Sequence, residues 1–198
     1  MTDSTSTRSG LLVGVVIDLD DPDRLGRVKV SYPELGEAHS DWASLVTLMA
    51  GKQRGSVFRP EKGDEVIVGF LQGDMRAPYV LGGVWSTPDP PPADDGHPTD
   101  NNWRFITSRS GHVIRFDDTK GAERIEVIDK DGRRRVVLDS ANKKITVAAD
   151  EGDVDVSAPA GTIRLSGRSI ELHATTTLSL TADQGLTIRG LTVDINPG

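Results

Sequence analysis

The last third of the chain carries a short repeat that limits the possible folds more than any other feature. In "SIELHATTTLSLTADQGLTIRG", residues 169–190, pairs of aliphatic residues one position apart alternate with small, polar and charged residues. From residue 145 onward the pairs begin at steps of 9, 9, 7, 8, 8 and 7 residues, which gives a mean period of 8. The seven pairs are Ile145 with Val147, Val154 with Val156, Ile163 with Leu165, Ile170 with Leu172, Leu178 with Leu180, Leu186 with Ile188, and Val193 with Ile195.

A repeat of this length is typical of one short β-strand followed by a corner. Residues i and i+2 of a strand lie on the same face, so each pair faces inward and the residue between them faces water. Residues that suit a corner lie between the pairs: Gly152, Pro159, Gly161, Gly167, Gly185 and Gly190. All aromatic residues lie at or before Phe116, which indicates an interior too narrow for large rings. The tail is therefore predicted to form a β-solenoid or prism.

The tail is too short to make a convincing solenoid from one chain. At three strands per turn, residues 142–198 would complete only about two turns, with both ends open. Burial of the aliphatic pairs alone would not offset the entropy lost in ordering this backbone. Three chains wound together would give every strand neighbours and would build a needle about 30–35 Å long. The pairs are then the core of a homotrimer, and a monomeric solenoid or irregular β-domain is the alternative.

Residues 10–85 have a different pattern, with five strand-like runs separated by turn residues. The runs are "LLVGVVIDL", "RVKVSY", "WASLVTL", "EVIVGFL" and "YVLGGVW". Five short strands predict a closed β-barrel of the OB type, although a split sandwich fits the pattern nearly as well. The one helix candidate, "SLVTLMAGKQRG", contains Gly51 and Gly55, which favour a strand and a loop.

These patterns divide an all-β chain into five segments. Residues 1–9 are polar and are expected to form a loose arm, and residues 10–85 form the barrel. Residues 86–102, "STPDPPPADDGHPTDNN", are rich in Pro and Asp and are interpreted as a linker. Residues 103–140 are expected to form junction strands, and residues 141–198 the octad repeat.

Charge and composition exclude several classes of function. The formal net charge of -7 argues against a general nucleic-acid or anionic-membrane surface. The chain has no Cys, so disulfides and thiolate metal sites are excluded. No apolar run approaches the roughly 20 residues that span a bilayer, and no signal-peptide pattern opens the chain.

Two acidic stretches can be compared with known sites. Asp117, Asp118 and Glu123 could suggest the paired carboxylates of a glycosidase, but no cleft-forming region surrounds them, so a solvated turn is expected. "DKDG", residues 129–132, resembles the start of an EF-hand loop without its later ligands. A hairpin turn is expected there instead.

The remaining polar candidates also favour structural roles. Ser108 and Ser110 lie near His112, but no nucleophile elbow is present, so no catalytic residue is predicted. The histidines, at positions 39, 97, 112 and 173, form no His-x-His or His-x-x-x-His pair. Neither a metal site nor a cofactor is therefore expected.

Two long stretches carry motifs in a recognisable order. "DPDRLGRVKVSYPEL" contains G-R-V-K-V, and "WASLVTLMAGKQRGSVFRPEKGDEVIVGFLQGDMRAPYVLGGVW" contains a Trp before the third strand and then G-D-E-V-x-V. They resemble the OB domain of phage baseplate assembly protein V and of VgrG-type spikes. "SRSGHVIRFDDTKGAERIEVIDKDG" is similar to the junction that follows this domain in VgrG proteins, and the octad tail resembles their trimeric β-helix.

The resemblance implies a non-enzymatic homotrimeric spike at the tip of a contractile phage tail or phage-tail-like injection system. Such spikes lie beneath a hub on the end of the tube and are pushed through the target envelope when the sheath contracts. The resemblance further implies a component of a virion or phage-tail-like particle, assembled in the bacterial cytoplasm. An OB-fold module for nucleic acid or glycan on a β-solenoid stalk is the alternative.

The chain departs from the family pattern in two places. VgrG proteins carry a hub-like domain before the OB domain, whereas about nine residues precede it here, so a separate hub protein is expected. Some phage spikes carry a lysozyme domain where this chain has only the linker.

The C-terminal sequence also bears on the partners. The segment "LTVDINPG" lacks the His-x-His with which some family spikes bind iron at the needle end. A separate PAAR-type tip protein is therefore expected to contact Ile195, Asn196, Pro197 and Gly198.

Overall fold

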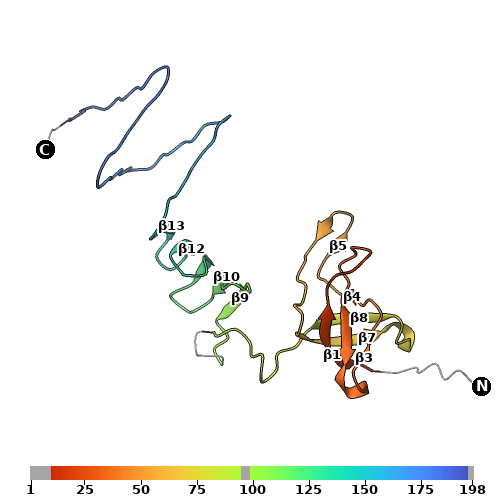
Figure 1. The fold of residues 1–198 in the computed structure, drawn as a ribbon. Helices are drawn as coiled ribbons and strands as arrows, with labels where there is room; N and C mark the ends of the chain where they lie inside the picture. The colour runs from red at the N-terminus through yellow and green to blue at the C-terminus, as the bar shows by residue number, and fades with distance from the viewer. Residues whose placement is uncertain (1–9, 95–98, 196–198) are drawn as a thin grey trace, which may run out of the picture.

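The computed structural model describes residues 10–94 and 99–195, and these residues form an all-β chain. Figure 1 shows a barrel, a second sheet and an extended tail in succession along the chain. Within the described ranges the helical content is limited to two short 3-10 turns, η1 (Pro33–Leu35) and η2 (Leu71–Gly73). None of the described helices is long and apolar enough to cross a membrane.

The barrel is one six-stranded sheet that closes on itself. Its strands are β1 (Leu12–Asp18), β2 (Lys29–Tyr32), β3 (Ala38–His39), β4 (Ser44–Leu45), β7 (Glu65–Phe70) and β8 (Pro78–Gly83), in the order β3-β2-β1-β7-β8-β4. β4 pairs in parallel with β8, and Ala43, just before β4, exchanges two backbone hydrogen bonds with Val28, just before β2. The sheet thereby returns to its own start, which confirms the OB-type barrel and not the split sandwich.

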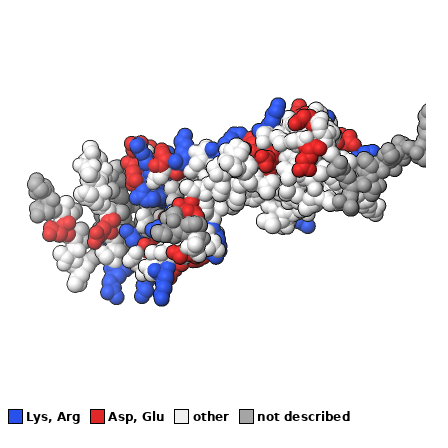
Figure 2. Space-filling model, turned by 90° about the horizontal axis from the view of Figure 1, so that it is seen from below, with Lys and Arg blue, Asp and Glu red and all other residues white. Residues whose placement is uncertain are grey.

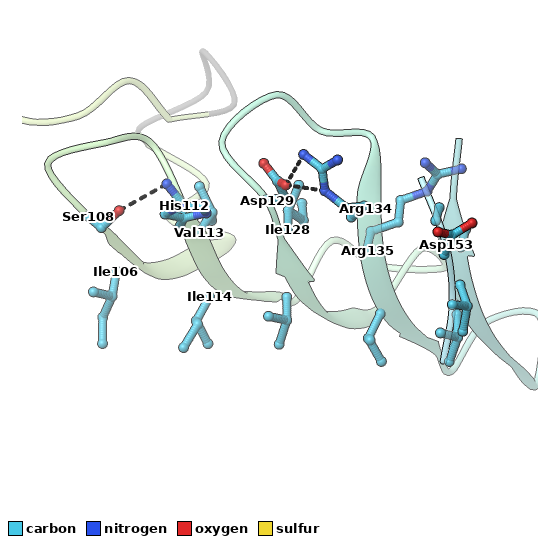
Figure 3. Close-up of a pocket in the computed structure, with 16 residues that line it drawn as sticks. Ile106, Ser108, His112, Val113, Ile114, Ile128, Asp129, Arg134, Arg135 and Asp153 are labelled. Carbon is cyan, nitrogen blue, oxygen red and sulfur yellow. Dashed lines mark hydrogen bonds and ion pairs between the residues drawn. The ribbon is translucent and has the colours of Figure 1, made fainter. Parts of the chain in front are cut away.

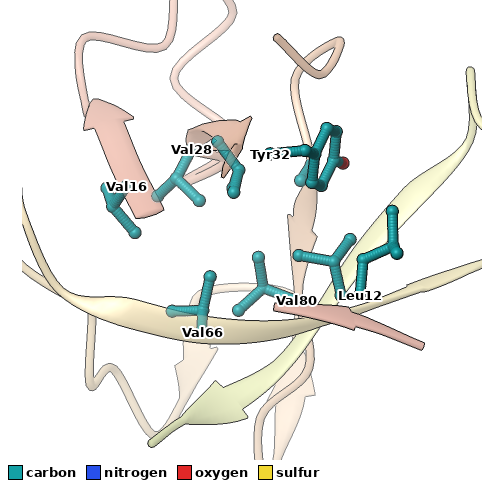
Figure 4. Close-up of a cluster of buried hydrophobic side chains, with 9 residues drawn as sticks. Leu12, Val16, Val28, Tyr32, Val66 and Val80 are labelled. Atoms are coloured by element: carbon teal, nitrogen blue, oxygen red, sulfur yellow. The ribbon is translucent and has the colours of Figure 1, made fainter. Parts of the chain in front are cut away.

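The barrel core is built from small aliphatic side chains that alternate along the strands. Figure 4 shows the cluster, in which β1 and β7 contribute every second residue. Its members are Leu12, Val16, Val28, Val30, Tyr32, Ala43, Val66, Val68 and Val80. Gly14 is needed where β1 crosses β2, because a Cβ at this position would lie 2.1 Å from Val30 Cγ1.

A buried carboxylate shapes the loop between β1 and β2. Asp21 accepts hydrogen bonds from the backbone N–H groups of Asp23, Leu25 and Arg27. It also pairs with the Arg27 guanidinium, at 2.6 Å between Arg27 Nη2 and Asp21 Oδ1. The hydrogen bonds from Arg27, together with those of the backbone, outweigh burial and hold the pKa of Asp21 well below its ordinary value of 3.8.

A small hairpin projects from the barrel between β4 and β7. Its strands, β5 (Ala50–Gly51) and β6 (Arg54–Gly55), pair only with each other. Figure 1 shows it standing away from the barrel sheet. The segment "SLVTLMAGKQRG" is thus strand and loop, as its glycines predict.

The second sheet is a five-stranded antiparallel meander. Its strands are β9 (Trp103–Thr107), β10 (Val113–Asp117), β11 (Arg124–Ile128), β12 (Arg134–Asp139) and β13 (Lys144–Ala149), each paired with the next. β13 contains the first octad pair, Ile145 and Val147, so the junction strands and the start of the repeat share one sheet. The described parts of the segment 86–102 that leads into it contain no strand.

Beyond β13 the tail bends at a regular interval. Bends or turns begin at residues 159, 167, 175, 183 and 191, each eight residues after the one before. They fall between the aliphatic pairs, although the bends at Thr175–Thr176 and Asp183–Gln184 contain no Gly. In this single chain the described residues 150–195 form no strand ladder.

Candidate interaction surfaces

One face of the meander sheet is almost entirely aliphatic. The strand register places one residue from each strand in a row across the sheet: Ile106, Ile114, Val127, Val136 and Val147. A second row beside it holds Phe116, Ile125, Leu138 and Ile145. These nine side chains are 37–72% exposed. Figure 3 shows Ile106 and Ile114 projecting to the same side, along a groove of about 590 Å³.

The opposite face of the same sheet carries Trp103 and Phe105 beside charged residues that pair with one another. Arg115 Nε lies 2.7 Å from Glu126 Oε2, and Arg124 Nη2 lies 3.0 Å from Asp117 Oδ2. The Arg115 guanidinium also lies 3.9 Å from the centroid of the Trp103 ring. Because the charges of this face are paired with one another while the aliphatic face is exposed, the aliphatic face is the one that requires a partner.

The tail extends this apolar surface, and here the single chain differs from the expected core. Every residue of the seven predicted pairs is at least half exposed, from 50% at Ile163 to 85% at Ile195, because no other described part of the chain covers this face. The exposed residues are Ile145, Val147, Val154, Val156, Ile163, Leu165, Ile170, Leu172, Leu178, Leu180, Leu186, Ile188, Val193 and Ile195. One chain alone therefore does not form a core from these pairs, and their burial in a trimer stays a prediction.

An exposed apolar surface of this extent marks an interaction surface. The pairs can face an interior only if partner chains cover both members of each pair. Asn196, Pro197 and Gly198, which were expected to contact a tip protein, lie outside the described residues.

The aliphatic face of the meander was not predicted, although its signal is present in the sequence. Apolar residues two positions apart recur before the octads, and the pairs are Ile114 with Phe116, Ile125 with Val127, and Val136 with Leu138. These pairs begin at residues 114, 125 and 136, so the period there is 11 rather than 8. The strands of the meander are joined by hairpins, which are longer than a simple corner. The spacing between successive pairs is therefore larger, but the pairs still lie on one face of the sheet.

The acidic cluster lies at the turn between β10 and β11, and its carboxylates are already engaged. Asp117 is buried, which by itself would raise its pKa, but hydrogen bonds from Thr119 and the charge of Arg124 keep the pKa below its ordinary value. Asp118 pairs with Arg104 at 2.7 Å. Glu123 accepts a hydrogen bond from the Gly121 N–H, which lowers its pKa. A glycosidase needs one carboxyl group with a raised pKa, and these shifts run the other way.

The "DKDG" stretch is a hairpin turn between β11 and β12, as expected. The Gly132 N–H donates to the Asp129 carbonyl oxygen, and Gly132 has φ +75°, a conformation that favours glycine. Asp129 and Asp131 are held by the guanidinium of Arg134. The carboxylates therefore fix the hairpin.

The "SRSGH" stretch is also a turn, between β9 and β10. Ser108 Oγ accepts a hydrogen bond from the backbone N–H of His112, at 3.0 Å. The ring of His112 is used elsewhere, since its Nδ1 accepts from the Lys130 N–H at 3.2 Å. The imidazole is thus not placed as a base for Ser108.

Neither a metal site nor a nucleic-acid surface was expected from the sequence. Among the described residues, no group of three or more His, Cys, Asp or Glu side chains is arranged to hold a metal ion. His97 lies outside those residues. On the face shown in Figure 2, Lys and Arg side chains are interspersed with Asp and Glu, unlike the basic stripe of a nucleic-acid site.

Comparison with known proteins finds a matching family model and several similar proteins. Residues 12–85 match the family model of the type VI secretion system/phage-baseplate injector OB domain. The chain is 30% identical over 134 residues to the type VI secretion system spike protein VgrG1a of Pseudomonas aeruginosa, which covers 62% of this chain and 21% of that protein.

Two further relatives are also spike proteins of type VI secretion systems. VgrG1c of Pseudomonas aeruginosa is 33% identical over 114 residues, 52% of this chain and 16% of the relative. VgrG3 of Vibrio cholerae is 35% identical over 111 residues, 52% of this chain and 11% of the relative. The matched segments thus span about a fifth or less of each relative. All three are named as spike proteins, which agrees with the expectation of a chain that is not an enzyme. Residues 12–85 thus match the type VI secretion system/phage-baseplate injector OB-domain family, and 52–62% of the chain is similar to VgrG-type spike proteins.

Proposed function

We propose that three copies of this chain form the central spike at the tip of a contractile phage tail or phage-tail-like injection system. The spike is not an enzyme, and its work is mechanical: a stiff, narrow point that pierces the target envelope when the sheath contracts. The observation that carries this proposal is the injector OB domain, joined to a tail that bends every eight residues.

The trimer follows from the unpartnered aliphatic surface. The meander presents nine exposed apolar side chains on one face, and the tail continues that surface with six more pairs. Three sheets that turn these faces toward a common axis would bury them together and leave the polar faces with Arg115 and Glu126 outside. Three tails wound about the same axis would supply the strand neighbours that one tail lacks. Residues 141–198 then form the needle, and residues 103–140 form its base.

The partners lie at the two ends of this spike. A hub protein binds on the OB-domain side, as the similarity to injector spikes suggests. A PAAR-type tip protein covers the far end, where Ile195 is the last described apolar residue. In this arrangement the chain links the hub to the tip, is assembled in the bacterial cytoplasm with the rest of the particle, and meets the target envelope only transiently.

Incorporation into particles tests the proposed role. Sheathed particles are purified from cells that produce an epitope-tagged chain and are labelled with gold-conjugated antibody. Label is expected at the end of the tube that meets the target, and deletion of the gene should abolish penetration of target cells. Particles that lack the chain, or that penetrate equally well without it, would contradict the proposal.

A further inference from the structure

The hairpin that projects from the barrel is held by its own hydrogen bonds and lies outside the barrel core. We call residues 46–58 the β5–β6 arm. Its ends are tied by Thr47, whose Oγ1 donates to the Ser56 carbonyl oxygen at 2.6 Å, and the Ser56 N–H donates to the Met49 carbonyl oxygen at 3.0 Å. A Cβ at Gly55 would lie 2.6 Å from that same Met49 oxygen, so the tight pairing requires glycine. The arm is therefore a preformed hairpin.

Five large apolar side chains of this arm face solvent. Its exposed large hydrophobic residues are Val46, Leu48, Met49, Val57 and Phe58, and Leu48 is 95% exposed. None of them belongs to the barrel core. An isolated two-stranded hairpin is at best marginally stable in water, and clustered exposed apolar groups mark a binding surface. The arm is thus expected to be covered in the assembled particle.

The charge of the arm indicates what covers it. Residues 46–60 contain Lys52, Arg54 and Arg59 and no Asp or Glu, whereas the whole chain has a net charge of -7. Arg24 and Leu25 line the hollow at the base of the arm, together with Phe58 and Arg59. An apolar surface with a basic border complements an apolar groove bordered by carboxylates.

The position of the arm in the fold indicates that a different protein covers it, and not a second copy of the chain. The aliphatic surface through which copies are proposed to associate begins at β9, beyond the linker, and the arm belongs to the barrel on the other side of that linker. The two surfaces are not continuous along the fold. We propose that the β5–β6 arm is a docking hairpin that inserts into an apolar, acid-rimmed groove on a different protein, on the hub side of the spike. This inference rests on the proposed function, since it identifies the surface by which the OB domain meets the hub.

The test measures binding of the full-length chain to the hub protein encoded in the same gene cluster. The double variant Leu48→Ser with Phe58→Ser removes apolar contacts, and Lys52→Glu reverses one charge. Leu71→Ser is the matched control, because Leu71 is also more than half exposed but lies in η2, outside the arm. The double variant should weaken binding by about tenfold or more, as expected for anchor residues of an interface. Lys52→Glu should weaken binding most at low salt, and the control should bind like the wild type.

Light scattering of each variant without the hub protein gives its mass. This distinguishes a loss of hub binding from a loss of association between copies of the chain. Unchanged mass with selective loss of hub binding supports the inference. Equal binding by the double variant, the control and the wild type would overturn it, as would failure of the wild type to bind the hub at all. A lower mass of the double variant alone would show that the arm binds a second copy, which also overturns it. A monomeric wild type would instead contradict the proposed spike.

Discussion

Replacing Leu178 by Asp should destroy the needle, and the structure indicates how large the effect is. Leu178 is 55% exposed in the single chain, so covering it in a trimer contributes about 1–1.5 kcal/mol per chain, roughly half the value of a fully buried leucine. The variant loses this contribution and buries an unpaired carboxylate, which costs several kcal/mol per ion. Three-fold symmetry repeats the change in every chain, so the trimer should lose on the order of 10 kcal/mol or more.

The matched control is Ser179→Asp, one residue along the same strand. Ser179 is exposed, and its side chain points away from the axis in the proposed register. Thermal unfolding followed by circular dichroism, with light scattering at the same concentration, measures both variants. The Leu178 variant should dissociate or melt far below the wild type, whereas the control should melt within a few degrees of it. Two variants with the same melting temperature and the same mass would refute the assignment of inward and outward faces.

Three further changes address the barrel and the acidic turns. Gly14→Ala should destabilise the barrel by about 1–3 kcal/mol, because the added methyl group overlaps Val30, and calorimetry should show a lower barrel transition with the trimer intact. The lowered pKa of Asp21 means that its ionised form stabilises the barrel above the ordinary pKa of 3.8 and that this stability is lost as the pH falls below that value. Asp21→Asn should therefore lower the melting temperature at pH 7 and reduce its acid dependence, and melts that match the wild type at every pH would contradict this. Purified protein should not cleave peptidoglycan in a dye-release assay; cleavage that Asp117→Asn abolishes would contradict the structural role of the acidic turns.

The barrel was largely predictable because its strands are buried on one face only. Alternation of Val66 and Val68 with residues of the other face shows the period of a strand directly. The strand pattern predicted a closed barrel but fitted a split sandwich nearly as well, since closure depends on the pairing of Val28 with Ala43, which no local pattern reveals. The β5–β6 arm was missed for a related reason: Leu48 and Phe58 look like core residues in sequence, and only the fold shows that they face solvent.

In the second half of the chain, the sequence predicted the bends of the tail but not the surface of the meander. The period of the tail predicted the bends closely, because a strand-and-corner repeat is local. The aliphatic face of the meander was not predicted, since longer hairpins change the spacing of its pairs. The pairing of Arg115 with Glu126 depends on the register between two strands, which fixes partners 11 residues apart. Such pairings require the three-dimensional structure.

The central claim is that three copies of this chain associate through the meander and the tail. Size-exclusion chromatography with multi-angle light scattering, at micromolar concentration, tests it most directly. A single species with a mass about three times the 21.3 kDa of one chain is expected. A stable monomer under these conditions would contradict it, because the exposed aliphatic surface would then have no partner among copies of the chain.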